Sequence, residues 1–234
     1  MGTQSGWNNK ISTGSAITLN CGTNALNLSS DASAGAVNLA TGGAAKVVTL
    51  GSTNSASSLD LQYGTADFSL ASATGNVMVA LDSGEITKPL QPAFLAYLST
   101  TQDNVIGDLT DYVIVFDTEV YDQNSDYAIG TGKFTAPVTG RYSFSTAVGV
   151  LGVTTSHTEI ALTFATSNSF YKVYNNSFGA SPTVTINPSW SGSIQCDMDA
   201  ADVVNIRIKV YNSTKTVDVT GSRTLTYFSG HLIC

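Results

Sequence analysis

The sequence predicts an all-β protein in two parts: a stalk of short repeated strands over residues 1–88 and an antiparallel β-sandwich over residues 89–234. Two observations carry this prediction. Apolar pairs recur at a near-constant step in the first part, and longer stretches of alternating apolar and polar residues fill the second. No stretch has a convincing helical period, and strands separated by short turns indicate a sandwich.

The stalk is predicted from residues 15–81, which are rich in Gly, Ser, Ala, Thr and Asn. Seven apolar pairs have second members at 19, 28, 39, 50, 61, 70 and 79, a step of 9 or 11 residues. Each pair is one face of a very short strand, which alone buries too little to offset about 1–2 kcal/mol of backbone ordering per residue. Stacked copies from three chains would share a core, so we expect a trimeric β-stalk, intertwined or side by side. The alternative is a disordered Gly/Ser-rich linker.

The boundary between the two parts is predicted at residues 88 and 89. Residues 75–87 are typical of a short hairpin with a turn at Ser83-Gly84. Two prolines, Pro89 and Pro92, then stop any ladder of strands, because proline lacks the backbone donor.

The predicted strands of the second part have clear faces. Val204, Ile206, Ile208 and Val210 alternate with Asn205, Arg207 and Lys209, and two further apolar sets are Tyr142, Phe144, Val148 and Val150, and Ile160, Leu162 and Phe164. The last strand is apolar or aromatic on both sides, with Tyr227 on one and Phe228 on the other. One side must meet the sandwich core, so the other needs a second buried environment.

A succession of motifs in this part resembles the C1q-like globular head, a relative of the tumour-necrosis-factor jelly roll. The motifs are Pro89-Leu90-Gln91-Pro92-Ala93-Phe94-Leu95-Ala96, Val115-Phe116-Asp117, Gly132-Lys133-Phe134-Thr135-Ala136-Pro137, Gly140-Arg141-Tyr142-Ser143-Phe144-Ser145 and Tyr227-Phe228-Ser229-Gly230-His231-Leu232-Ile233. The resemblance implies a jelly-roll sandwich that acts as an interaction module. One departure is Ala201, which stands where the family has a glycine in a turn before a β-branched strand.

The resemblance also implies a homotrimer in which the first and last strands line the three-fold axis. The expected trimer contacts are Phe94, Tyr97, Tyr142, Tyr227, Phe228 and His231, the alternative being that they are ordinary core residues of a monomer. Three symmetry copies of His231 would make a three-histidine metal cluster, but a packed, hydrogen-bonded histidine is the favoured interpretation.

The sequence contains no catalytic motif, so we expect that the chain is not an enzyme. The two histidines have no carboxylate or serine motif around them, and there is no nucleophile elbow, HExxH, CxxC or phosphate loop. No cofactor is expected except possible calcium, for which Asp122, Asn124 and Asp126 are the candidates because Ca²⁺ prefers oxygen ligands. The favoured alternative is a plain turn, in which Asp and Asn are also common.

Charge and composition restrict the partners. A net charge of −7 repels nucleic-acid phosphates, and no apolar run approaches the roughly 20 residues that span a bilayer, so we expect no nucleic-acid partner and no membrane insertion. Three cysteines, Cys21, Cys196 and Cys234, leave at least one thiol unpaired, and three reduced thiols are favoured. The N-terminus lacks a secretory signal, so the chain either stays in a cytoplasm or was cut from a longer protein, which we favour.

The layout of stalk, hairpin and head looks like the distal part of a bacteriophage tail fibre or related virion fibre. We expect a homotrimer in the virion, assembled in the host cytoplasm and joined to the rest of the fibre upstream of residue 1. The head would bind a host cell-surface glycan or protein through loop residues Trp190, Tyr171, Tyr174, Asn175 and Asn176, although Trp190 suits the core equally well. The alternatives are a purely structural virion or appendage protein, in which the head is a trimerisation module, and a secreted C1q-like adhesin or lectin.

Overall fold

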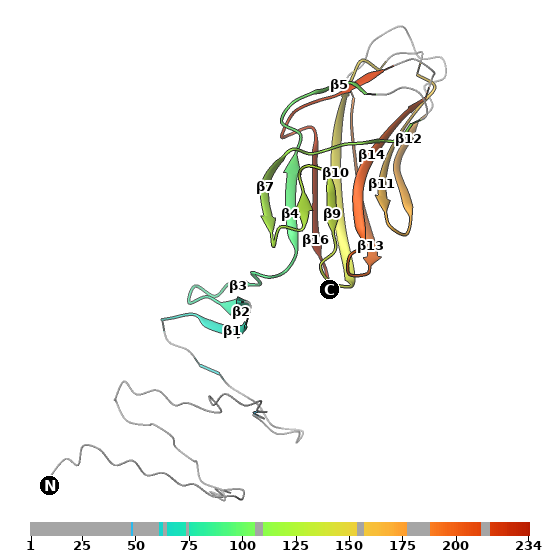
Figure 1. Cartoon of the computed structure of the whole chain (residues 1–234). Coiled ribbons are helices and arrows are strands. Elements are labelled where there is room, and N and C mark those ends of the chain that lie inside the picture. Colours follow the sequence, from blue (N-terminus) through green and yellow to red (C-terminus); the bar gives the residue numbers. More distant parts are fainter. Residues whose placement is uncertain are drawn as a thin grey trace, which may run out of the picture. The chain divides into compact units, whose positions relative to one another are not determined.

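The computed structural model describes residues 48, 61–62, 65–73, 75–105, 110–153, 157–176, 188–211 and 216–234 (Figure 1). The chain divides into two compact units, Met1–Gln62 and Tyr63–Cys234. The first five apolar pairs of the expected repeat lie wholly or partly outside the described residues, so the trimeric stalk and its boundary at residue 88 stay predictions. The described residues form no helix, and thus none that is long and apolar enough to cross a membrane.

The last two apolar pairs of the repeat belong to a small antiparallel sheet. Its strands are β1 (Phe68–Ser72), β2 (Gly75–Ala80) and β3 (Ile86–Thr87), in that order. The hairpin expected at Ser83-Gly84 is confirmed: Gly84 has a φ of +100°, and its N–H donates to the Leu81 carbonyl at 3.0 Å. In a single chain the side chains of Leu70, Val77 and Ile86 remain exposed.

The rest of the second unit is a sandwich of two antiparallel sheets, as the sequence predicts. The first sheet contains, in spatial order, β5 (Gln102–Val105), β15 (Val217–Val219), β10 (Gly140–Leu151), β16 (Tyr227–Leu232), β4 (Ala93–Tyr97) and β7 (Thr118–Gln123), and β13 (Ser189–Met198) also pairs with β10. The second contains β12 (Phe170–Asn176), β11 (Glu159–Thr166), β14 (Val203–Tyr211), β9 (Lys133–Thr135) and β8 (Tyr127–Ala128), with β6 (Tyr112–Val113) paired to β14.

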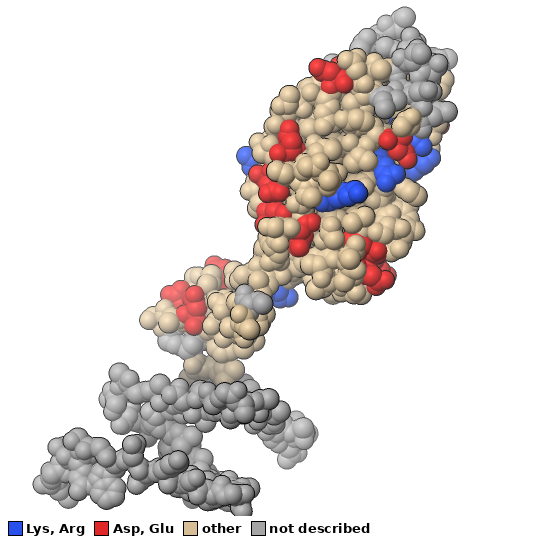
Figure 2. Space-filling model, in the orientation of Figure 1, with Lys and Arg blue, Asp and Glu red and all other residues tan. Residues whose placement is uncertain are grey.

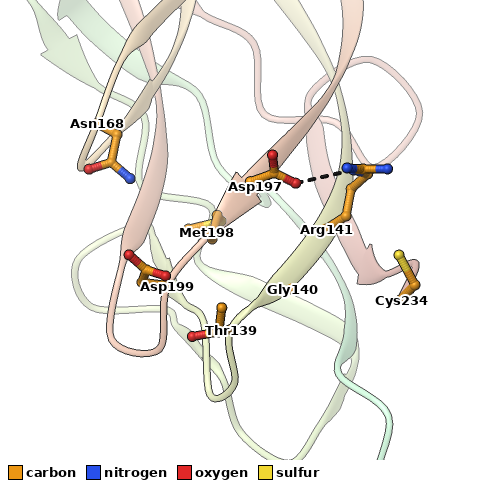
Figure 3. A pocket seen from close by; sticks show the side chains of 8 residues that line it. All are labelled: Thr139, Gly140, Arg141, Asn168, Asp197, Met198, Asp199 and Cys234. Atoms are coloured by element: carbon orange, nitrogen blue, oxygen red, sulfur yellow. Dashed lines mark hydrogen bonds and ion pairs between the residues drawn. The ribbon is translucent and has the colours of Figure 1, made fainter.

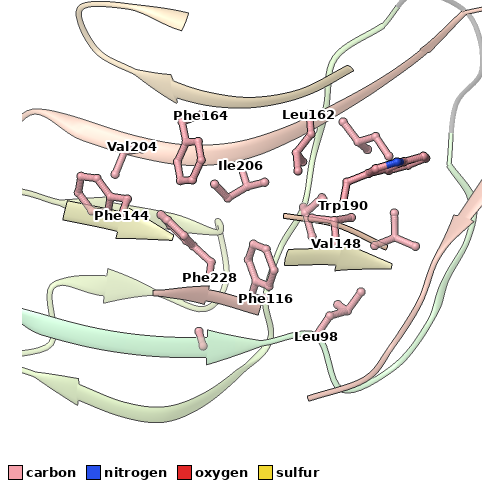
Figure 4. Packing of buried hydrophobic residues seen from close by; sticks show 14 of the residues in the cluster. Leu98, Phe116, Phe144, Val148, Leu162, Phe164, Trp190, Val204, Ile206 and Phe228 are labelled. Carbon is pink, nitrogen blue, oxygen red and sulfur yellow. The ribbon is translucent and has the colours of Figure 1, made fainter. Parts of the chain in front are cut away.

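The core between the sheets is built from the alternating residues that the sequence marks as inward. Val204, Ile206, Ile208 and Val210 of β14 are fully buried, and so are Tyr142, Phe144, Val148 and Val150 of β10 and Ile160, Leu162 and Phe164 of β11. Figure 4 shows Phe164 and Ile206 pointing from one layer toward Phe228 of the other. Burying one such side chain contributes about 1.5–3 kcal/mol, so this alternation is the main source of stability.

One glycine makes the aromatic part of the core possible. Gly230 of β16 lies opposite Phe144 of β10 and Phe94 of β4. A Cβ at Gly230 would stand only 2.3 Å from the Phe144 ring and 2.9 Å from the Phe94 ring. The missing side chain therefore lets both rings cross the strand, and Phe94 stacks at 5.0 Å on both Tyr127 and Phe134.

The turn between β13 and β14 keeps a left-handed residue without a glycine. Ala201 has a φ of +74° and is exposed. Its N–H donates to the Ala136 carbonyl at 2.8 Å, and the next N–H, of Asp202, donates to the Asp199 carbonyl at 3.0 Å. Alanine therefore occupies a left-handed position in this turn, which glycine would adopt more easily, and β14 starts at Val203 as expected.

Candidate interaction surfaces

The outer side of the first sheet presents an apolar face, which we define by Leu95, Tyr97, Val120, Tyr121 and Tyr227. In the strand register Tyr97 pairs with Tyr227, and Leu95 pairs with Tyr121. A shift in the pairing of β4 with β7 brings Val120 to the same side, where a pocket of about 180 Å³ is lined by Leu95, Tyr97, Val120, Arg223 and Tyr227. Tyr121 is 51% exposed and Val120 is 38% exposed, so a chain alone leaves this face in water.

Three of the six expected trimer contacts do not reach the surface of the first sheet. Phe94, Tyr142 and Phe228 are completely buried in the core of a single chain, so that assignment was wrong and the monomer-core alternative holds for them. Each is the inward neighbour of an outward residue on its strand, because side chains alternate along a strand. The other three, Tyr97, Tyr227 and His231, reach the surface of the first sheet, and their role in a trimer stays a prediction.

His231 is exposed on the same sheet, between Ala93 of β4 and Ser143 of β10. It lies beside a pocket of about 350 Å³ whose lining also includes Lys88, Gln123 and Leu232. Within the described residues no group of three or more His, Cys, Asp or Glu is placed to hold a metal ion.

The residues expected in ligand-binding loops lie in strands instead. Trp190 belongs to β13, is only 8% exposed and stacks on Tyr174 of β12 with ring centroids 4.7 Å apart. That aromatic pair joins the edge strands of the two sheets, so Trp190 is a core residue and its assignment to a ligand loop was wrong. Tyr174 is likewise packed against the core. Tyr171 and Asn175 are exposed on β12, and the side chain of Asn176 lies outside the described part of the chain.

The outer side of the second sheet presents a cationic face, which we define by Lys133, Phe170, Lys172, Arg207 and Lys209. The register places Arg207 opposite Thr163, and Thr163 opposite Lys172, so these side chains point to the same side. Asn205, two residues before Arg207, pairs with Lys133 on one side and with Ala165 on the other. Ala165 in turn pairs with Phe170, so Lys133 and Phe170 lie on this side as well. Figure 2 shows Lys and Arg side chains gathered on the side of the head where Figure 1 places β11, β12 and β14.

The geometry of the cationic face is fixed by contacts of Arg207. Its Nε donates to Asn205 Oδ1 at 3.0 Å, and its guanidinium carbon lies 5.3 Å from the centroid of the Phe170 ring. Asp111 partly neutralises the face, because its Oδ1 lies 2.9 Å from Lys209 Nζ and its Oδ2 lies 3.6 Å from Arg207 Nη1. The hydrogen bond from Lys209 to Asp111 raises the pKa of the lysine, which therefore stays charged at neutral pH.

The candidate calcium residues form a turn closed by its own hydrogen bonds. The Asp122 carboxylate accepts the N–H groups of Asp126 at 3.1 Å and Tyr127 at 3.0 Å, and Asn124 Nδ2 donates to the Leu90 carbonyl at 3.0 Å. Asn124 and Ser125 both have positive φ, as Asn often does in turns. This geometry favours the plain-turn interpretation, and calcium binding stays a prediction.

Asp126 in this turn has an unusual environment. Its Oδ2 is buried and accepts no hydrogen bond from any described residue. Burial, and secondly the negative charge of Asp122, raise its pKa to about 6. The side chain therefore takes up a proton at mildly acidic pH.

A third surface feature is a pocket of about 300 Å³ between the β9–β10 and β13–β14 turns, lined by Thr139, Gly140, Arg141, Asn168, Asp197, Met198, Asp199 and Cys234 (Figure 3). The one cation among these residues, Arg141, pairs with Asp197 at 3.1 Å, and both side chains are largely exposed. Such exposed pairs contribute little to stability, and this one leaves the Asp199 carboxylate of the same lining unneutralised. Cys234 is exposed and Cys196 is buried, and neither is in a disulfide.

Several residues of the two faces were not singled out from the sequence. Val120, Tyr121 and Phe170 are exposed apolar side chains within strands, and Arg223 places its guanidinium carbon 5.9 Å from the Tyr97 ring centroid. An exposed and a buried aromatic residue look the same in a sequence unless the strand register is known. The alternation in residues 204–210 already placed Arg207 and Lys209 on a common outer face, but only the pairing of β12 with β11 shows that Phe170 and Lys172 lie on the same side.

Comparison with known proteins gives one family match. The family model of the C1q domain matches residues 93–233. Among solved structures, the globular domain of zebrafish complement 1qA protein is 18% identical, with a TM-score of 0.41, over 62% of this chain and 98% of that chain. A crystal structure of murine APRIL is 10% identical, with a TM-score of 0.44, over 61% of this chain and 99% of that chain. Eiger TNF from S. frugiperda is 14% identical, with a TM-score of 0.43, over 62% of this chain and 92% of that chain. No curated protein matches the chain.

Proposed function

This chain belongs to the C1q domain family, whose model matches more than half of it, and we propose that it is the distal part of a trimeric virion fibre, such as a bacteriophage tail fibre. Its head binds a host cell-surface receptor, a glycan or a protein, and its repetitive stalk projects the head. The chain is then a binding module rather than an enzyme.

The observation that carries this proposal is the apolar face. Leu95, Tyr97, Val120, Tyr121 and Tyr227 form one contiguous surface around a pocket, and exposed apolar surface of this kind marks an interaction site. The occupant we propose is a second and a third copy of the same chain. The exposed apolar residues of β1–β3 support identical copies, because the same association that covers the head would also cover the repeats that precede it.

A trimer also explains how such a head binds a cell. Three identical sites on one fibre raise the effective concentration of the second and third contacts, so overall binding can exceed that of one site by about 10²–10⁴. Each site can therefore be weak and still hold a virion on a surface that repeats the same receptor.

Sedimentation equilibrium of the full chain tests the assembly. We expect three times the mass of one chain for the unmodified protein and a shift toward monomer for Tyr121→Asp, which puts a charge on the apolar face. Thr135→Asp is the matched control, because it adds the same charge at an exposed position of β9 in the other sheet. A monomeric unmodified chain, or equal effects of the two substitutions, would contradict the trimer through this face.

Binding of the labelled trimer to a panel of bacterial strains and purified surface polysaccharides tests the receptor function. Saturable binding to a narrow set of strains is the expected result. A stable trimer that binds none of them would indicate the structural alternative, in which the head only aligns the stalk chains.

A further inference from the structure

The proposed function leaves the ligand unnamed, and the cationic face points to its chemistry. The chain carries a net charge of −7, yet four of its ten Lys and Arg residues, Lys133, Lys172, Arg207 and Lys209, lie on the outer side of one sheet. Among the residues that the structure describes, two carboxylates share this side, Asp111 and Glu159. The cations exceed the carboxylates, so the face attracts an anion although the whole chain repels one.

An exposed aromatic ring accompanies these charges. Phe170 is 65% exposed, the highest value among the large apolar side chains of the described residues. It lies on β12, the edge strand of the sheet, opposite Ala165. Only small side chains, Thr163 and Ala165, stand between β14 and β12, so the Arg207 guanidinium reaches across β11 to the ring.

The contact between Arg207 and Phe170 orients both groups before any ligand arrives. The guanidinium is attracted to the face of the Phe170 ring, and its hydrogen bond to Asn205 fixes its other side. A planar guanidinium recognises a carboxylate by two parallel hydrogen bonds, whereas the ammonium groups of Lys172 and Lys133 act as mobile point charges. The face therefore combines one oriented hydrogen-bond donor for an anion, flexible cations and an apolar ring.

We propose that the cationic face binds an acidic polysaccharide, with Arg207 and Lys172 contacting its carboxylates and Phe170 stacking on the apolar side of a sugar ring. The proposal rests on the receptor-binding function above and names the class of its ligand. A carboxylated sugar chain fits because it alternates anionic groups with apolar ring faces, as the face alternates cations with Phe170.

A nucleic acid fits this surface less well. It carries one phosphate for every nucleotide, and such a continuous line of charge would also meet Asp111, Glu159 and the acidic remainder of the chain. A sugar polymer with more widely spaced carboxylates avoids these contacts. The face is also on the opposite sheet from the apolar face, so trimer formation and ligand binding do not compete for the same residues.

The experiment measures binding of the full chain, in its assembled state, to immobilised hyaluronan, polygalacturonate and polysialic acid. The carboxyl methyl ester of each polymer is the neutral control. We expect saturable binding to at least one acidic polymer, at least tenfold weaker binding to its ester, and weaker binding at 200 mM than at 50 mM salt, because charge drives the contact.

Variants localise the binding. Arg207→Gln should weaken it about tenfold or more, as expected for loss of a charge-assisted contact. Phe170→Ser changes an exposed side chain without removing core packing and should weaken binding with little change in its salt dependence. Arg141→Gln removes the same charge from the first sheet and should change affinity less than twofold, while circular dichroism and sedimentation verify that each variant folds and assembles.

Two outcomes would overturn the proposal. One is equal binding of the acidic polymers and their esters, or none, by a chain that still forms trimers and binds cells; the receptor function would then survive with another ligand. The other is tighter binding to a DNA duplex or to phosphatidylserine vesicles than to every polymer. A chain that neither assembles nor binds any strain would instead refute the proposed function itself.

Discussion

Replacing Ala201 with glycine should stabilise the protein, although the substitution adds no contact. Ala201 occupies the left-handed region with a φ of +74°, which costs an ordinary L residue roughly 1–2 kcal/mol. Glycine adopts this conformation freely but loses about 0.5–1 kcal/mol through the greater entropy of its unfolded chain. The methyl group of Ala201 is exposed, so its loss removes little burial. We therefore expect a net gain of about 0.5–1 kcal/mol.

The adjacent residue provides a matched control. Ala200 lies in the same turn and is also exposed, but its φ is not positive. In Ala200→Gly only the entropy loss remains, so this variant should be destabilised by about 0.5–1 kcal/mol. The two substitutions remove the same methyl group one residue apart and should change stability in opposite directions.

Urea unfolding followed by tryptophan fluorescence measures both effects, since Trp190 is buried in the folded head. The chain concentration must be equal in all samples, because association adds to the apparent stability of an oligomer. The slope of the free energy against urea should stay constant while the midpoint moves. Equal destabilisation by Ala201→Gly and Ala200→Gly would refute the reasoning, because it would mean that the left-handed backbone carries no cost here.

Three further substitutions test other parts of the structure. Gly230→Ala should destabilise the head by about 1–3 kcal/mol in the same assay, because its Cβ would collide with the Phe144 and Phe94 rings, and a midpoint equal to that of the unmodified chain would contradict this. Asp126→Asn tests a pH effect: the raised pKa means that the fold favours the protonated carboxyl, so the unmodified chain loses stability as pH rises from about 4 through 6. The asparagine variant should match it at pH 4 and exceed it at pH 7.5, by on the order of 1 kcal/mol after solvent screening, and a constant difference would exclude the titration. Gln91→Leu removes the 2.7 Å hydrogen bond from Nε2 to the Leu232 carbonyl, so faster amide exchange is expected around the end of β16 and not in β14.

The two-sheet fold could be predicted from the sequence because alternation reports directly on burial. The inward residues of β10, β11 and β14 were predicted correctly, since each strand has one face that must be apolar. Which of the expected trimer contacts reach the surface could not be predicted from the sequence. Phe94 and Phe228 are core residues and Tyr97 and Tyr227 are surface residues, yet all four are aromatic, and only the strand register separates them.

The errors in the ligand residues have a similar cause. The run of amides after Tyr174 is typical of a loop, but β12 continues to Asn176 because it pairs with β11 as far as Ile160. Once β12 is a strand, the aromatic residues Tyr174 and Trp190 belong to the closed edge of the sandwich rather than to an exposed loop. Local composition cannot reveal this, because the pairing partner lies elsewhere in the chain.

The separation of core, apolar face and cationic face follows from the geometry of single strands. On β14 the even-numbered residues 204–210 stabilise the sandwich, whereas Arg207 and Lys209 lie on the opposite side. On β4, similarly, Phe94 and Ala96 are buried and Leu95 and Tyr97 form part of the apolar face. Substitutions on the outer positions can therefore change assembly or ligand choice without removing core contacts. If the first sheet binds neighbouring copies and the second binds the receptor, as we propose, such a head can change its receptor without losing its assembly.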